Sequence, residues 1–167
     1  INISEASVTP EDAPDNFNEE GFPIVDDPIT LTMFASRSAA NGPYKDMFMF
    51  KAYEKKTNIR FEYNDVPSEG FDEKKSLVFG KKDLPDIFYK AYISNDDLMK
   101  YGSSGALVPL EGLIKKYAPN IQSIFDKYPE VKKGITSPDG HIYGMSSVIE
   151  PLVQRTNKLW INKKMLK

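Results

Sequence analysis

The fold prediction rests on the stretch Leu84-Pro85-Asp86-Ile87-Phe88-Tyr89, in which one carboxylate interrupts an otherwise apolar or aromatic run. A short apolar run bounded by turn signals is typical of a β-strand that is buried on both faces. Two more candidate strands precede it, at residues 29–34 and 59–63, and helical patterns at residues 44–57 and 68–80 separate the three. This alternation predicts a parallel sheet with crossover helices. Ligands bind where the strands of such sheets end, so the residues after this stretch are candidates for a binding site.

The composition fits one domain and excludes several classes of function. The chain has 167 residues, of which 40% are apolar and 12% aromatic, enough for a hydrophobic core. No run approaches the roughly 18 apolar residues that span a membrane. Cysteine is absent, which excludes disulfides and thiolate metal sites within these residues. Only one histidine is present, so neither a histidine-rich metal site nor a histidine-based catalytic triad is expected.

The first 28 residues differ in charge from the remainder. They hold eight acidic residues and no lysine or arginine, whereas residues 29–167 carry 22 basic against 16 acidic residues. Four prolines interrupt the acidic segment, and such a composition predicts a flexible tether. The tether is either a spacer between an anchor and a domain or an unstructured terminus. Three apolar residues of this segment are candidates for docking on the body: Phe17, Phe22 and Ile24.

The two crossover helices have different apolar patterns. The helix expected at residues 44–57 has a broad apolar face, made of Tyr44, Met47, Phe48, Phe50, Ala52 and Tyr53. The helix expected at residues 68–80 is shorter, with Phe71, Leu77 and Val78 as its apolar residues. We expect Gly80 to end that second helix in a left-handed conformation.

Further helices follow the third strand. Ser94 can cap a helix that ends at Gly102. Two short helices are expected at residues 110–117 and 120–128, with Asn120 as the cap of the second. These boundaries depend on the prolines and glycines between the helical patterns.

Short apolar segments and one turn complete the pattern. Residues 106–110 predict an edge segment, and Ser137-Pro138-Asp139-Gly140 has the residues of a type I turn. Residues 142–145 predict a strand that returns to the sheet. Residues 159–162 form a last apolar segment with little chain after it to cover it, so we expect that the chain is cut in mid-fold.

Several of these segments resemble one family. The residues Gly80 and Asp83-Leu84-Pro85-Asp86-Ile87-Phe88 are similar to the G-D-L-P-D-I stretch of bacterial extracellular solute-binding proteins, the sugar-capturing components of ABC importers. The similarity continues in the same order through Gly105-Ala106-Leu107-Val108-Pro109-Leu110, Tyr117-Ala118-Pro119-Asn120, Pro138-Asp139-Gly140-His141-Ile142-Tyr143-Gly144 and Leu159-Trp160-Ile161-Asn162-Lys163-Lys164. The chain most resembles the LipO-like lipoprotein branch of this family, found in Gram-positive bacteria.

The resemblance implies an α/β, periplasmic-binding-protein-like (type II) lobe, with a mainly parallel sheet and helices on both faces. Residues 29–148 would be the N-terminal lobe, and residues 149–167 the hinge crossing and the start of a second lobe, without which the fold is incomplete. The first lobe of such proteins also takes back a later strand, so we expect an open slot beside residues 84–89. The resemblance further implies an extracellular protein, lipid-anchored at the outer face of the cytoplasmic membrane, although the family's lipid-bearing cysteine is not among these residues.

Candidate ligand contacts come from the loops after three expected strands. Sugars are bound by aromatic faces and by polar groups, and parallel strand ends meet at one edge of a sheet. Each residue could instead be a solvated loop side chain or a packing aromatic. Asp86 is better explained as a buried carboxylate that binds backbone. The candidates are Ser36 and Arg37 after the first strand, Tyr89, Lys90 and Tyr92 after the third, and Ser146, Ser147 and Glu150 after the returning strand.

No catalytic or metal chemistry can be assembled from the remaining residues. His141 follows a tight turn and is expected at the surface, and Asp96 and Asp97 are explained by helix capping. No calcium loop is present. The residues 102–105 lack the lysine of a phosphate loop, and the lysine pairs are spread along the chain instead of gathered for nucleic acid. We therefore predict no enzyme activity, no cofactor, no metal and no nucleic-acid partner.

The predicted function is extracellular capture of a carbohydrate, an oligosaccharide in particular, and its delivery to an ABC permease. Binding would be non-covalent, in a cleft between two lobes that close on the ligand. The alternative is a stand-alone interaction module that self-associates through the open sheet edge. An enzyme is the least favoured of the three readings, since no substrate class can be named.

Overall fold

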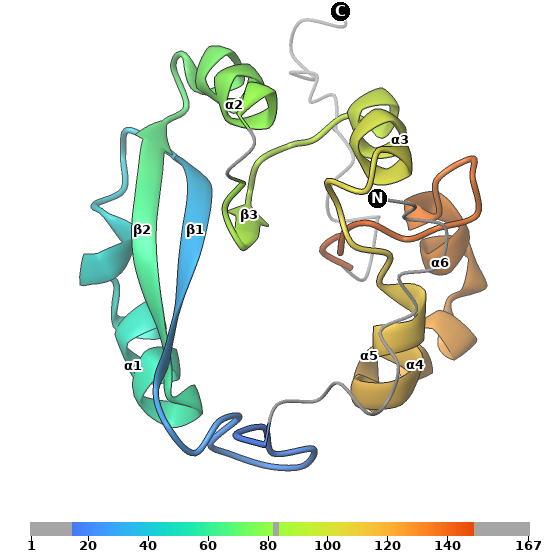
Figure 1. Cartoon of the computed structure of the whole chain (residues 1–167), viewed down its shortest axis with the longest axis horizontal. Helices are drawn as coiled ribbons and strands as arrows, with labels where there is room; N and C mark the ends of the chain where they lie inside the picture. Colours follow the sequence, from blue (N-terminus) through green and yellow to red (C-terminus); the bar gives the residue numbers. More distant parts are fainter. Residues whose placement is uncertain (1–14, 82–83, 149–167) are drawn as a thin grey trace, which may run out of the picture.

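A computed structural model describes residues 15–81 and 84–148 of the chain. Figure 1 shows the sheet with the first two helices on one side of the molecule and the later helices on the other. The connection from β3 to α3 joins the two halves. In chain order the elements are β1 (Ile29–Arg37), the 3₁₀-helix η2 (Tyr44–Asp46), α1 (Phe48–Thr57), β2 (Ile59–Pro67), α2 (Phe71–Gly80), β3 (Ile87–Tyr89), α3 (Asn95–Ser103), α4 (Glu111–Tyr117), α5 (Pro119–Lys127) and α6 (Pro129–Ile135).

The described strands form one parallel sheet in the order β2-β1-β3, which confirms the predicted βαβ arrangement. β1 pairs with β2 along its whole length and with β3 from Met33 to Ala35. β1 and β2 are longer than expected. The stretch that suggested a strand buried on both faces is a three-residue, half-buried edge strand, and β1 has the buried central position instead.

A side-chain clamp explains why β3 begins only at Ile87. Asp86 Oδ2 accepts hydrogen bonds from the backbone N–H and the hydroxyl of Thr32, both at 2.7 Å, and the Asp86 N–H donates to Thr32 Oγ1 at 2.9 Å. These bonds replace the strand ladder at this point and lower the pKa of Asp86, the bond from the Thr32 N–H being the main cause. Asp86 therefore binds backbone as expected, but it is exposed and precedes the strand.

Helices cover both faces of the sheet, as predicted. Because side chains alternate along a strand, Met33 and Ala35 pack on one face and Phe34 on the other. The first face packs against η2 and α1 through Tyr44 and Phe50, and the second against α2 and the chain after β3. The second cluster consists of Phe34, Val66, Phe71 and Ala91.

The helix expected at residues 44–57 is two elements, and its apolar face is narrower than predicted. Met47 is extended and separates η2 from α1. Tyr44 and Phe50 are buried, but Phe48 is 86% exposed. Gly80 is the last residue of α2, as predicted, but its predicted left-handed conformation is wrong. Gly70, before α2, has the left-handed conformation instead.

The later helices follow the prediction only in part. Ser94 caps α3, since its Oγ accepts from the Asp97 N–H at 3.2 Å. The prediction that Asn120 caps α5 is wrong, because α5 begins at Pro119 and Asn120 lies inside its first turn. The helix α6 was not predicted. Pro129 fits the end of the preceding helical pattern, but it is also the first residue of α6, because proline is accommodated in the first turn of a helix.

Neither of the two later strands expected from the sequence is present in the described residues. Segments 106–110 and 142–145 share one backbone hydrogen bond, from the Leu110 N–H to the Ile142 carbonyl at 2.7 Å. Ile142 is buried among α4, α5 and α6, in contact with Ile114 and Phe125. The segment after the turn therefore packs on the helices, and its predicted return to the sheet is wrong.

Residues 15–28 pack on the body where a flexible tether was expected. Val25 is buried, and the N–H groups of Ile24 and Val25 donate to the Thr57 carbonyl at 3.1 and 3.4 Å. The ring of Phe17 meets Tyr117 edge-on at 5.3 Å, and Lys56 Nζ lies 4.0 Å from the centre of the Phe22 ring. The docking considered for Phe17, Phe22 and Ile24 is thus confirmed.

Some predictions lie outside the described residues. The tether at residues 1–14 and the hinge crossing with the apolar segment at residues 149–167 belong to this group. Among the residues that are described, no helix has the length and apolar character to cross a membrane.

The close approach of Tyr143 to α3 gives a stability prediction. A Cβ atom added at Gly102 would come within 2.3 to 2.7 Å of atoms of the Tyr143 ring. The ring is buried, and its hydroxyl donates to Asp139 Oδ2 at 2.9 Å. We expect Gly102→Ala to lower the free energy of unfolding by about 1–3 kcal/mol in a urea titration, the usual effect of overpacking.

Gly112→Ala is the matched control for this substitution. Gly112 lies in α4, and no atom lies within 4 Å of the position of its missing Cβ. Alanine there should raise the free energy of unfolding by roughly 0.5–1 kcal/mol, because alanine is the better helix former. Equal effects of the two substitutions would contradict the packing of Tyr143 on α3.

Candidate functional site

The carboxyl ends of the three strands meet at one edge of the sheet. β1 ends at Arg37 opposite Pro67 of β2, and Ala35 lies opposite Tyr89, the last residue of β3. The parallel pairing thus places two of the three predicted loop groups beside each other: Ser36 and Arg37 with Tyr89, Lys90 and Tyr92.

Arg37 is held by the protein itself. Its Nε lies 2.9 Å from Asp65 Oδ2 as an ion pair, although the N–H does not point well enough at that oxygen to form a hydrogen bond. One Nη donates to the Asn41 carbonyl at 2.9 Å. Arg37 therefore fastens the end of β1 to the end of β2 and to the following loop. The sequence reasoning missed Asp65, whose signal is an acidic residue at the end of a neighbouring parallel strand.

Ser36 lies inside the strand, so the prediction that it starts a loop is wrong. It is 7% exposed, and its carbonyl accepts a hydrogen bond from the Tyr44 hydroxyl at 2.6 Å. Burial, then the neighbouring Tyr89 and Asp65, raise the pKa of Tyr44. Tyr44, read from the sequence only as part of an apolar helix face, is thus a central residue beneath this edge of the sheet.

Tyr89 packs beside Tyr44 in a small aromatic cluster. The Tyr89 ring meets Tyr44 at 5.5 Å and Phe50 at 5.7 Å, in edge-to-face geometry. Lys90 is exposed, and its Nζ lies 5.5 Å from the centre of the Tyr89 ring. The ring contacts hold Tyr89 in place, and the ammonium group of Lys90 lies beside the cluster.

The loop after β3 is strained and displays one large aromatic side chain. Lys90 and Tyr92 have φ angles of 49° and 47°, in the left-handed region that residues with a side chain seldom adopt. Each such residue costs about 1–3 kcal/mol, and such residues gather at ligand sites. Ala91 between them is buried, whereas Tyr92 is 79% exposed.

The third predicted group does not follow a strand of the described sheet. Ser146 and Ser147 are exposed and belong to no helix or strand. The strand that was to bring them to the sheet edge is absent from residues 141–148, since Ile142 packs among the helices. Glu150 lies outside the described residues. Of the three loops predicted to meet at this edge of the sheet, the structure therefore places the loops after β1 and β3 there.

An ion pair fastens the turn before Ser146 to α4. His141 Nδ1 lies 2.6 Å from Glu111 Oε1, and the Ile142 N–H donates to Glu111 Oε2 at 3.2 Å. Burial pushes the pKa of Glu111 upward, but the bonds from His141 and from the backbone outweigh it and lower that pKa.

Burial and the bond to Asp139 raise the pKa of Tyr143 to about 12.

The strand-end residues line neither of the two hollows found in the described residues. One hollow, of about 340 Å³, lies at the opposite end of the sheet, lined by Pro28 and Arg60 among others. A second, of about 320 Å³, lies between α5 and α6. Within residues 15–81 and 84–148 no group of three or more histidine, aspartate or glutamate side chains is placed to hold a metal. The arrangement can bind a ligand from one side by stacking and polar contacts.

Comparison with known proteins identifies the family. The model of a family described as bacterial extracellular solute-binding protein matches residues 36–167. Over 152 residues the chain is 33% identical to the fructooligosaccharide ABC transporter substrate-binding protein FusA of Streptococcus pneumoniae serotype 4 (strain ATCC BAA-334 / TIGR4), a match covering 87% of this chain. The chain belongs to the bacterial extracellular solute-binding protein family.

Solved structures agree with this assignment. Streptococcus pneumoniae FusA in complex with kestose superposes with a TM-score of 0.64 and 34% identity, over 68% of this chain and 23% of that one. The alginate-binding protein AlgQ2 without calcium ion gives 0.58 and 30%, over 71% and 24% of the two chains. A solute-binding protein from Bifidobacterium longum subsp. infantis, 22% identical with a TM-score of 0.60 over 70% and 22%, supports the fold alone. The periplasmic-binding-protein-like (type II) fold is thus confirmed.

The chain corresponds to only part of these relatives. It covers 28% of the length of the Streptococcus pneumoniae protein. The Streptococcus pneumoniae relative is named as an ABC transporter substrate-binding protein.

The pair of His141 and Glu111 predicts a pH dependence of stability. The hydrogen bond to Glu111 raises the pKa of His141, so the folded state holds this proton more tightly than the unfolded state. The stabilisation is therefore complete below the unfolded-state pKa of about 6.5 and is lost as the pH rises through the higher folded-state pKa. The His141 side chain is 47% exposed, so we expect only about 0.2–1 kcal/mol.

Urea titrations of the wild type and His141→Gln at about pH 5.5 and about pH 8.5 measure this effect. The wild type should exceed the variant in free energy of unfolding at the lower pH, and the difference should shrink at the higher pH. A difference that is constant or larger at the higher pH would contradict the ion pair.

Proposed function

We propose that the protein carrying this chain captures oligosaccharides outside the cell and delivers them to an ABC permease, and that residues 29–148 form its N-terminal lobe. The observation that carries the proposal is the strained loop after β3, which displays an exposed Tyr92 at the carboxyl edge of the sheet. Family membership and the fructooligosaccharide named for a relative of 33% identity support it.

The geometry suggests how the residues at the strand ends would bind a sugar. The exposed Tyr92 ring can stack on the apolar C–H surface of a sugar ring, and Lys90 can donate to hydroxyl oxygens. Tyr44 and Tyr89 would support these two residues from below through their mutual edge-to-face contact. Ser146, Ser147 and Glu150 would join the site from the hinge side, with residues 149–167 leading into a second lobe.

Closure would complete the site. An open face that contacts a sugar on one side leaves the other side in water, so binding by this lobe alone should be weak. A second lobe that folds over the ligand excludes water and creates a closed form for the permease to recognise. The first residues would tether the protein to a lipid anchor on the outer face of the cytoplasmic membrane, as in the Gram-positive lipoprotein branch that the motifs resemble. The self-associating module is less favoured, because the relative of 33% identity is named as an ABC transporter substrate-binding protein.

The ligand role of Tyr92 can be tested in the complete protein. Tyr92→Ala should weaken binding of fructooligosaccharides such as kestose by about tenfold in calorimetry, since a stacking face is lost. Its thermal unfolding should change little, because the side chain is mostly in water. Phe48→Ala is the matched control, as Phe48 is an exposed aromatic on α1.

Two outcomes would contradict the proposal. One is equal affinity of Tyr92→Ala, Phe48→Ala and the wild type, which would remove Tyr92 from the site. The other is a complete protein that binds no member of an oligosaccharide panel but binds peptides, which would overturn the sugar assignment. We also expect no micromolar binding of sugar by residues 1–167 alone.

A further inference from the structure

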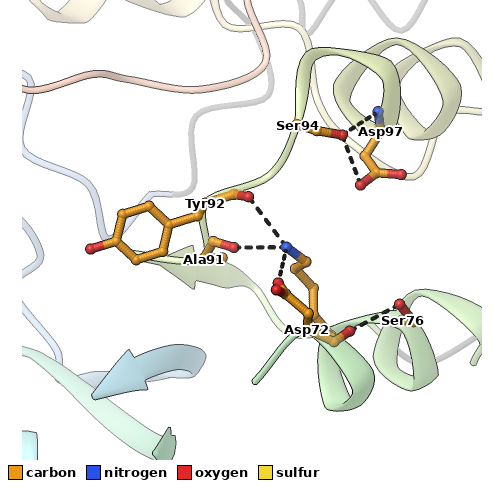
Figure 2. Close-up of polar contacts among 7 residues, drawn as sticks. Asp72, Ser76, Ala91, Tyr92, Ser94 and Asp97 are labelled. Atoms are coloured by element: carbon orange, nitrogen blue, oxygen red, sulfur yellow. Dashed lines mark hydrogen bonds and ion pairs between the residues drawn. The ribbon is translucent and has the colours of Figure 1, made fainter. Parts of the chain in front are cut away.

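Lys75 is a buried lysine of α2 whose ammonium group is fully used by the protein. It is 8% exposed, although lysine is rarely buried without partners. Its Nζ donates to Asp72 Oδ1 at 2.9 Å and to the carbonyls of Ala91 and Tyr92, both at 3.2 Å. Figure 2 shows these three oxygens converging on one nitrogen. A lysine ammonium has three donors, so none remains for a ligand.

The two carbonyls belong to the strained loop. Left-handed residues with side chains persist only where the surrounding structure holds them. Tyr92 is such a residue, and Lys75 binds its carbonyl and that of the residue before it. On the far side, Ser94 caps α3 through Asp97, as Figure 2 also shows. The loop is thus held by β3 at its start, by the hydrogen bonds from Lys75 in its middle and by the cap of α3 at its end.

The hydrogen bonds from Lys75 also constrain the orientation of Tyr92. In Figure 2 the carbonyl of Tyr92 faces the nitrogen, whereas its ring points the opposite way. Lys75 binds the carbonyls of Ala91 and Tyr92, which belong to the two peptide planes on either side of the Tyr92 Cα atom. Holding both planes fixes the direction of the Tyr92 Cα–Cβ bond, from which the exposed ring projects.

We propose that Lys75 is a positioning residue for ligand binding, which holds the loop after β3 so that Tyr92 and Lys90 face a bound saccharide. The inference rests on the proposed function, since it gives this buried lysine a role in the same site. Asp72, whose side chain is 90% exposed, pairs with the ammonium group from the solvent side. A neutral side chain of similar length would fill the space but leave both carbonyls without a donor.

The test compares Lys75→Met with Lys74→Met in the complete protein. Lys74 is the exposed neighbour on the same helix, so the control makes the same change in charge. Two quantities are measured: the affinity for fructooligosaccharides by calorimetry, and amide hydrogen exchange by mass spectrometry. Lys75→Met should lose about tenfold in affinity and exchange faster at residues 89–94, with the rest of the sheet unchanged. Lys74→Met should match the wild type in both.

A chemical rescue separates positioning from simple packing. Residues 1–167 contain no cysteine. In the complete protein, with any cysteine outside these residues replaced by serine, Lys75→Cys therefore supplies a single thiol. Alkylation of the unfolded variant with 2-bromoethylamine, followed by refolding, restores an ammonium group at nearly the original length. Alkylation with 2-bromoethanol adds a neutral group of similar size. Affinity should return with the first reagent and not with the second.

The outcomes distinguish this inference from the function on which it rests. If the wild type binds oligosaccharides and Lys75→Met keeps the same affinity, the inference is overturned and the function stands. Faster exchange throughout the lobe, or equal rescue by both reagents, would also overturn it. If the wild type binds no oligosaccharide, the proposed function fails and the ligand role of Lys75 with it, whereas a local rise in exchange would still show that the lysine holds the loop.

Discussion

The pairing of β1 on both of its edges is the constraint on which the rest of the structure depends. β1 lies between β2 and β3, which pair with both of its edges, and helices pack on both faces of the sheet. The residues of β1 from Met33 to Ser36 are therefore buried. The parallel direction brings the ends of all three strands to one edge, where Arg37 and Asp65 fasten two of them together. The clamp between Thr32 and Asp86 fixes where β3 begins, and so where the loop bearing Tyr92 emerges.

The order of strands and crossover helices could be predicted because apolar periodicity is a local property of the chain. The failed strand predictions depended on partners distant in sequence. The stretch 84–89 was read as a buried central strand, but Asp86 binds Thr32 with its side chain, which shortens the strand and leaves it at the edge of the described sheet. Ile142 looked like a strand residue, and only the helical cluster around Phe125 reveals where it packs.

The candidate site was predictable at the level of loops and not of side chains. The rule that ligands bind at strand ends pointed to Tyr89, Lys90 and Tyr92, and the structure brings this group beside Arg37. The residues near Arg37 in the sequence did not indicate that it forms an ion pair with Asp65. The role of Lys75 was equally invisible, because its partners lie 16 and 17 residues further along the chain.

The most direct test of this account is the structure of the complete protein with a bound fructooligosaccharide. The account predicts a sugar ring stacked on Tyr92, with Lys90 donating to a hydroxyl oxygen and the loop after β3 in the left-handed conformation described above. A second lobe should cover the opposite side of the sugar. A sugar that contacts none of residues 89–92, or a ligand that is not a saccharide, would contradict the central claim.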